Sequence, residues 1–153
     1  MYPEGHAGLT LAFSSLLMIP FGENYETMVF IIVTTLLSSL PDIDLILQRK
    51  GIPIHHRGFT HSLLFALIIG VVFGSVLFYL YKTWIYIPIG FFARVTGIMT
   101  HLVGDMLSYM PFKPLWPFRE TTISYGIFSA DNQDANNAMI VLGIICFALY
   151  ALT

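Results

Sequence analysis

Residues 55–81, HHRGFTHSLLFALIIGVVFGSVLFYLY, join a dense polar motif to a long apolar run. Three of the five histidines of the chain, an arginine and two hydroxyl residues lie within positions 55–62. An α-helix needs about 20 mostly apolar residues to cross the hydrocarbon core of a bilayer. Residues 60–81 therefore predict a membrane-spanning helix that begins at the polar motif. The polar groups of the motif need partners, because unpaired polar groups are costly in an apolar medium.

Composition extends this prediction to the whole chain. Of the 153 residues, 56% are hydrophobic and only 10% are charged, whereas soluble domains carry roughly 25% charged residues. Four further apolar runs lie at residues 7–21, 27–47, 85–108 and 138–152. We therefore expect an all-α integral membrane protein, with residues 1–153 forming one domain built as a compact bundle of about five transmembrane helices. The net charge of −2 gives a nucleic-acid partner no electrostatic support.

Two local features refine the predicted helices. Pro41 removes a backbone donor, so the second helix is expected to end or kink near Leu40. Gly70 and Gly74 form a small-xxx-small pattern, which suits close packing of the third helix against another one. The lone Cys146 excludes a disulfide or a cysteine-based zinc site within the chain.

The distribution of basic residues predicts the orientation in the cell membrane, because Lys and Arg favour cytoplasmic loops. Loop 48–58 has three basic residues and loop 109–137 has two, whereas turn 82–84 has one and loop 22–26 has none. We therefore expect a multi-pass protein with the N-terminus and loops 48–58 and 109–137 in the cytoplasm. All histidines then lie in one layer near the cytoplasmic ends of the helices.

Aspartates accompany the histidines in this layer. His101 and Asp105 are four residues apart, on one helix face, and the irregular backbone expected at Pro41 allows Asp42 and Asp44 to converge. Imidazole and carboxylate groups together favour a divalent transition metal. We expect one or two ions, with zinc as the first choice and manganese or iron as alternatives. The predicted metal ligands are His6, Asp42, Asp44, His56, His61, His101 and Asp105.

Other polar residues are candidates for contact with a substrate. Arg57 offers a planar guanidinium group that suits a phosphate. The predicted substrate-binding residues are Arg57, Thr60, Ser62 and Arg94, and the predicted catalytic residues are Asp42, Asp44 and Arg57. We interpret His55 as a loop residue at the membrane surface.

Each cluster also has a purely structural interpretation. His101 and Asp105 could form a hydrogen-bonded pair that stabilises helix packing, and the aspartates near Pro41 could be solvated at a helix end. Thr60 and Ser62 could cap the following helix. Arg94 could be a structural counter-ion or extend its charged end toward the membrane surface.

The motifs resemble those of a known family. Gly5-His6, Leu40-Pro-Asp-Ile-Asp44, His56-Arg-Gly-Phe-Thr-His-Ser62 and His101-x-x-x-Asp105 occur in this order in the YdjM/YbcI-type family, whose members are classed as membrane-bound metal-dependent hydrolases. The resemblance covers residues 5–117, including Leu115-Trp116-Pro117. It implies a multi-span helical protein with a metal-dependent hydrolase site. The chain is also distantly similar to zinc-dependent phospholipase C and its nuclease relatives, which makes phosphoester hydrolysis the leading chemistry.

Our first functional hypothesis is an enzyme, a membrane-embedded metal-dependent hydrolase that cleaves a phosphoester of a lipid or interfacial substrate with metal-activated water. The alternatives are a divalent metal transporter and a non-enzymatic membrane protein with a structural metal. Transport sites have polar residues that continue to the other membrane face, and the helices at 60–81 and 138–152 carry few of them there. Phosphatase, phospholipase and amide hydrolase are all compatible with this residue order.

Overall fold

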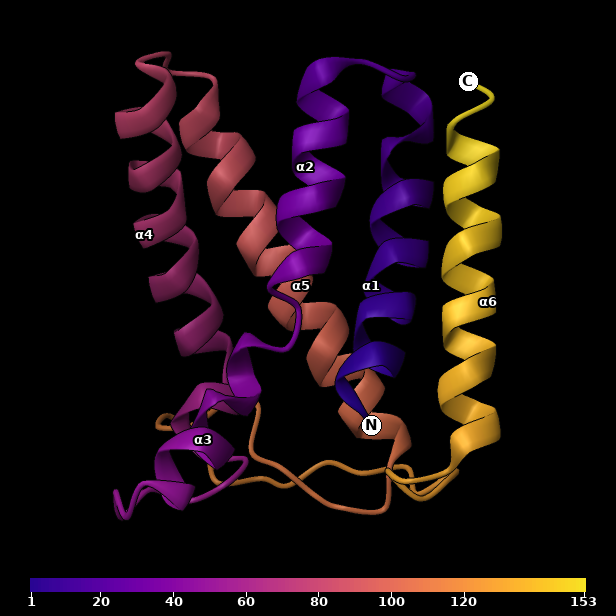
Figure 1. Cartoon of the computed structure of the whole chain (residues 1–153). Helices are drawn as coiled ribbons and strands as arrows, with labels where there is room; N and C mark the ends of the chain where they lie inside the picture. The colour runs from indigo at the N-terminus through magenta and orange to yellow at the C-terminus, as the bar shows by residue number, and fades with distance from the viewer.

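The computed structural model describes all 153 residues and consists of helices and their connections, without a β-strand. Five long helices lie side by side (Figure 1). They are α1 (Pro3–Met18), α2 (Tyr25–Leu36), α4 (Leu63–Tyr81), α5 (Tyr86–Leu107) and α6 (Gln133–Tyr150). The shorter elements are η1 (Ile19–Phe21), η2 (Leu40–Asp42), α3 (Ile43–Arg49) and η3 (Phe59–His61). The predicted all-α class is confirmed.

Four segments are long and apolar enough to cross a membrane: Tyr25–Arg49, α4, α5 and α6. The remaining long helix, α1, has 16 residues and runs beside them over much of the same height (Figure 1). Since a full crossing takes about 20 residues, α1 is a short fifth member of the bundle. The predicted count of about five transmembrane helices is consistent with this arrangement.

Glycines allow the helices to approach closely. A Cβ at Gly74 would lie 2.7 Å from the carbonyl oxygen of Ile87, and one at Gly90 would lie 2.8 Å from the Cα of Gly74. The predicted small-xxx-small contact of the third span therefore exists, between α4 and α5. Helices α1 and α6 meet in the same way, because a Cβ at Gly143 would lie 2.5 Å from the carbonyl oxygen of Gly8.

Two helix boundaries differ from the sequence-based expectation. Helix α2 ends at Leu36, before the Leu40 position predicted from Pro41, and the chain then turns through η2 into α3. Helix α6 begins at Gln133 rather than at the start of the apolar run, because the side chain of Asn132 accepts a hydrogen bond from the backbone N–H of Ala135 and caps it. In α6 the apolar run therefore covers only part of the helix, and the capping residue sets where the helix begins.

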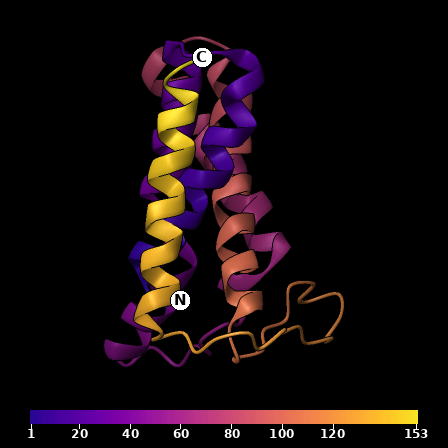
Figure 2. The same ribbon diagram turned by 90° about the vertical axis from the view of Figure 1, so that its right-hand side faces the viewer.

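The connections divide between the two ends of the bundle. The N-terminus, α3 and the connection from α5 to α6 lie at one end, and the C-terminus and the turn between α4 and α5 lie at the other (Figure 1). The α5–α6 connection runs beneath the lower helix ends in both ribbon views (Figure 2). We call this the lower end. The expected grouping of the N-terminus with loops 48–58 and 109–137 at one end is therefore present.

Candidate metal centre

The lower end brings all seven predicted metal ligands into three overlapping groups. In each group the ligand atoms lie within 4.8 Å of one another, so that each group could hold a metal ion. The groups are His6, His101 and Asp105; Asp42, His61 and His101; and Asp44, His56 and His61. These residues come from α1, η2, α3, η3, α5 and the loop before η3. Most of their side chains are buried. Because buried His and Asp side chains are costly without partners, they must be satisfied by one another, by other polar groups or by an ion.

Five of the six distances among four ligand atoms, those that involve His61 or His101, are close to the edge length of a tetrahedral zinc site. The Nε2 atom of His61 lies 3.4 Å from Nε2 of His101, 3.5 Å from Oδ1 of Asp42 and 3.3 Å from Oδ2 of Asp105. The Nε2 atom of His101 lies 3.7 Å from Oδ1 of Asp42 and 3.5 Å from Oδ2 of Asp105. Ligands bound to zinc at about 2.05 Å in a tetrahedron are separated by about 3.3 Å. These residues therefore fit a zinc-like ion.

The carboxylates dominate the electrostatics around His61. Burial alone would lower the pKa of His61, but the carboxylates of Asp105, Asp42 and Asp44 outweigh it and raise the pKa to about 10. Three carboxylates around one imidazole create a strongly negative potential. A divalent cation would neutralise this potential, since metal ions are often the largest local charges in such sites.

Asp105 is held in place through its other oxygen. Its Oδ1 accepts a hydrogen bond from the Nη2 group of Arg57 at 2.6 Å and lies 3.5 Å from Nε2 of His6 and 3.5 Å from the amino group of Met1. Its Oδ2 faces the imidazoles of His61 and His101 and has no hydrogen-bond donor. Thus Oδ1 is held by the guanidinium group of Arg57 and lies beside His6 and the amino group of Met1, while Oδ2 could bind a metal ion.

His6 lies against α5 because Gly104 has no side chain. A Cβ at Gly104 would lie 2.9 Å from Nδ1 of His6. The ring of His6 stacks on that of His101, with centroids 3.7 Å apart. His6 can therefore either join His101 and Asp105 as a ligand or hold these two side chains in position.

Asp44 is surrounded by donors. Its Oδ2 accepts hydrogen bonds from the backbone N–H of Arg57 at 3.0 Å and from the hydroxyl of Thr60 at 2.9 Å, and its Oδ1 lies 3.0 Å from Nδ1 of His56. The same carboxylate lies 3.4 Å from Nδ1 of His61. A carboxylate that accepts from one imidazole nitrogen orients the other nitrogen toward a metal. This arrangement favours an orienting role for Asp44, behind His61.

Arg57 and the two hydroxyl residues of the motif have protein partners of their own. Arg57 has a φ of 60°, a left-handed conformation that is rare outside glycine, and its guanidinium group donates to Asp105, Ser108 and the carbonyl oxygen of Met110. Ser62 accepts a hydrogen bond from the N–H of Phe65 and so caps α4. Contact of Arg57, Thr60 and Ser62 with a substrate stays a prediction.

Arg94 and His55 lie apart from the ligand groups. Arg94 is fully buried on α5, two turns from His101, and none of its three side-chain nitrogens has a hydrogen-bond partner. Its guanidinium carbon lies 5.0 Å from the ring centre of Phe73, within the range of a cation–π contact. No carboxylate pairs with it, and its predicted contact with a substrate stays a prediction. His55 is exposed in the loop, as interpreted from the sequence.

Three residues with supporting roles were not singled out from the sequence. Ser108 accepts a hydrogen bond from Arg57 at the end of α5. Asn136 is fully buried and accepts a hydrogen bond from the N–H of Tyr2, which ties the start of α1 to α6. Arg49 lines the same cavity as Asp42 and has no ion-pair partner within 4.0 Å. Among these three residues, only Ser108 has a sequence feature that points to its role, because it follows the His101-x-x-x-Asp105 motif by three residues.

Comparison with known proteins identifies the family of the chain. The sequence model of the YdjM inner membrane protein family matches residues 1–153. No curated protein and no solved structure matches the chain. The match agrees with the four segments that are apolar enough to cross a membrane. The family and the apolar segments therefore both support a membrane location. Because the match extends over the whole sequence, the chain belongs to the YdjM inner membrane protein family.

Proposed function

We propose that this protein is a membrane-embedded metal-dependent hydrolase that cleaves a phosphoester of a lipid or interfacial substrate. The spacing of Asp42, His61, His101 and Asp105 carries the proposal, because it fits a zinc-like ion beside the guanidinium group of Arg57. Five of the seven basic residues lie at positions 49–57 and 113–119, and only Lys82 is at the other end. We therefore place the site on the cytoplasmic side.

The residues divide the work of hydrolysis. A bound transition metal would lower the pKa of a water molecule to about 7 and polarise a phosphoryl oxygen. In the reaction the water oxygen bonds to phosphorus, the ester P–O bond breaks, and its electron pair leaves with the alcohol oxygen, which takes up a proton. Asp42 is 20% exposed, more than the other carboxylates of the groups, and faces a cavity. Its Oδ1 belongs to the ligand set, and its other oxygen is therefore best placed to accept the proton that the water loses.

Arg57 stabilises the negative charge of the phosphoryl group in this proposal. Its side chain lines the same cavity as Asp42, and its Nε–H has no hydrogen-bond partner. A guanidinium group that already neutralises Asp105 keeps its orientation, so that a phosphate meets a preorganised cation.

A structural metal site is the second candidate. Four protein ligands complete a tetrahedron without an open position, which is typical of structural zinc. In the hydrolase, Asp42 would give up its place on the metal, or the metal would take a fifth ligand, so that water could bind. In the structural site all four side chains would stay bound.

Hydrolysis of soluble aryl phosphates tests the proposal. Zinc-loaded protein in detergent is expected to hydrolyse p-nitrophenyl phosphate or bis(p-nitrophenyl) phosphate, to lose this activity in a chelator and to regain it with zinc. Asp42→Asn is expected to lower the rate by about 100-fold or more, because it removes the general base and also weakens a metal ligand. Asp134→Asn, at an exposed site on α6, is expected to leave the rate unchanged. Tight metal binding without chelator-sensitive hydrolysis of either ester would contradict the hydrolase and favour the structural metal.

A further inference from the structure

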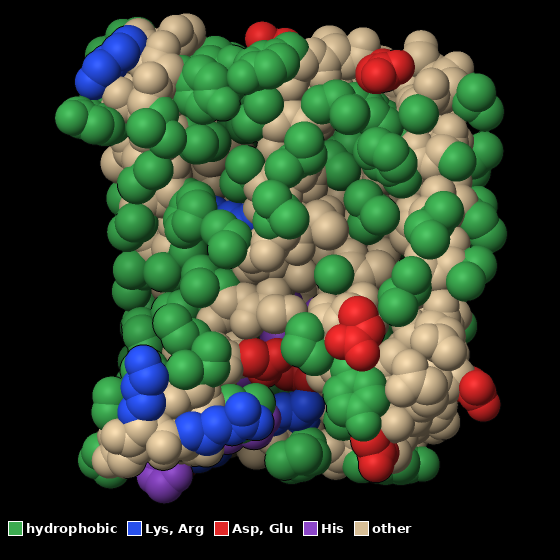
Figure 3. All heavy atoms as spheres, viewed as in Figure 1, with side chains coloured by type: hydrophobic (Ala, Val, Ile, Leu, Met, Phe, Trp, Pro, Cys, Tyr) green, Lys and Arg blue, Asp and Glu red, His purple; other side chains and the backbone are tan.

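A cavity of about 730 Å³ opens beside the ligand groups. It lies between the N-terminus of α1, the end of α2, α3 and the connection after α5, and its volume falls in the roughly 300–1,000 Å³ range of ligand sites. In Figure 3, acidic and basic side chains gather in a hollow near the lower end, below a surface rich in hydrophobic side chains. The cavity therefore joins the charged layer to the membrane-facing surface.

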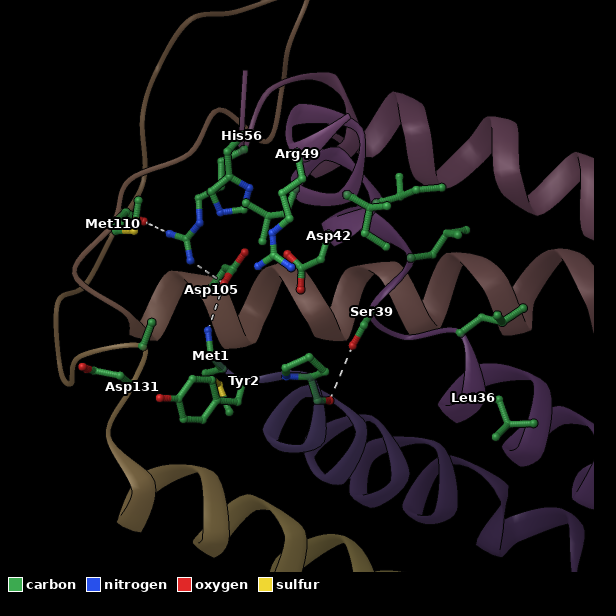
Figure 4. A pocket seen from close by; sticks show the side chains of 18 residues that line it. Met1, Tyr2, Leu36, Ser39, Asp42, Arg49, His56, Asp105, Met110 and Asp131 are labelled. Atoms are coloured by element: carbon green, nitrogen blue, oxygen red, sulfur yellow. Dashed lines mark hydrogen bonds and ion pairs between the residues drawn. The ribbon is translucent and has the colours of Figure 1, made fainter. Parts of the chain in front are cut away.

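The two ends of the cavity differ in chemistry. Figure 4 shows Asp105 and Met110 at one end and Leu36 at the other, with Asp42 and Arg49 between them. Leu36 and Leu37 belong to the apolar segment Tyr25–Arg49, and Leu36 is 75% exposed. In a bilayer this part of the wall contacts lipid tails. An occupant of the cavity thus meets polar groups at one end and apolar groups at the other.

Arg49 is the free cation of the cavity. It lies in the last turn of α3, its side chain is exposed, and it forms neither an ion pair within 4.0 Å nor a side-chain hydrogen bond. The guanidinium group of Arg57, by contrast, already donates to Asp105, Ser108 and Met110. Guanidinium groups bind phosphate in a bidentate manner. A phosphate beside Arg49 and Asp42 would therefore find an unused donor next to the metal ligands.

We propose that the cavity binds one lipid of the adjoining leaflet through a phosphate headgroup, which Arg49 recognises, while an acyl chain lies along Leu36 and Leu37. Asp42, Asp105 and Asp131 line the cavity together with Arg49 and Arg57, so the lining as a whole is not cationic. The unpaired guanidinium group of Arg49 is what supports a phosphate headgroup, and the apolar end supports a lipid over free phosphate. Hydrolysis of the bound lipid rests on the proposed hydrolase function. Binding of the lipid does not depend on that function.

Equilibrium binding of fluorescent phosphatidic acid to the full chain in detergent tests the proposal, with metal-free and zinc-loaded protein. Arg49→Gln is expected to raise the Kd by about 10-fold or more, as for the loss of a charge-assisted hydrogen bond. Lys50→Gln is the matched control, because it removes an exposed charge from the next position that does not line the cavity. It is expected to change the Kd by less than about two-fold.

Competition separates a lipid from a free phosphate. Unlabelled long-chain phosphatidic acid is expected to displace the probe at far lower concentration than dibutyryl phosphatidic acid or inorganic phosphate. Equal effects of the two substitutions, or equal competition by inorganic phosphate, would overturn the proposal. Binding through Arg49 without hydrolysis of any ester would leave the lipid site and refute the hydrolase, whereas hydrolysis of aryl phosphates without Arg49-dependent lipid binding would refute the lipid site alone.

Discussion

Asp105→Asn is expected to lower the affinity for zinc by at least about 100-fold, the upper range for loss of an orienting partner at a metal site. Asp105 contributes one oxygen to the tetrahedral set and uses the other to hold Arg57 and His6. Asparagine keeps the shape but removes the charge that both functions need. Isothermal titration of the metal-free variant with zinc measures the loss.

The same substitution is expected to destabilise the metal-free protein. Asp105 is 2% exposed and its partner Arg57 is 6% exposed, and breaking a buried ion pair costs roughly 3–5 kcal/mol. Thermal unfolding in detergent measures this change, with Asp134→Asn as the matched control on an exposed helix position. Zinc affinity within a few-fold of the unchanged protein would show that Asp105 is not a ligand.

His61→Ala is expected to abolish stoichiometric zinc binding. Its Nε2 atom faces His101, Asp42 and Asp105, so it touches every other member of the tetrahedral set. Alanine removes this ligand and also leaves three carboxylates without the imidazole that they surround. Zinc content of the purified variant after dialysis measures the effect, and His55→Ala, an exposed histidine of the same loop, is expected to retain the metal.

Asp44→Asn is expected to weaken zinc binding less than His61→Ala, by roughly 10–100-fold. Its carboxylate holds Nδ1 of His61 and accepts three further hydrogen bonds. If Asp44→Asn removed the metal as completely as His61→Ala, Asp44 would be a ligand itself, which would support a second ion in its group.

The transmembrane architecture follows from the sequence because apolar runs of span length have few alternatives to a membrane helix. The layer of histidines and aspartates also follows, since each lies at the end of such a run on the same side. The roles within the layer do not. Residues 37–42 connect α2 to α3 through a turn and η2, and residues 50–58 form a loop. No α-helical periodicity relates position to side-chain direction there. The sequence therefore does not distinguish Asp42, which faces the cavity, from Asp44, which lies behind His61.

The sequence does not predict the cavity either, because the connections around it lack a helical periodicity. Arg49 reads as one of several loop charges, and only the turn of α3 across the lower end places it near Asp42 (Figure 4). Arg94 illustrates the opposite case: the sequence offers it as a structural counter-ion, but it has no carboxylate partner in the structure.

X-ray absorption spectroscopy of the zinc-loaded protein in detergent tests the central claim most directly. We expect tightly bound zinc with two imidazole nitrogens and carboxylate oxygens at about 2.0–2.2 Å, and loss of one imidazole in His101→Ala. A folded protein that binds no zinc, or a spectrum without histidine ligands, would contradict the claim that His61, His101, Asp42 and Asp105 form a metal centre.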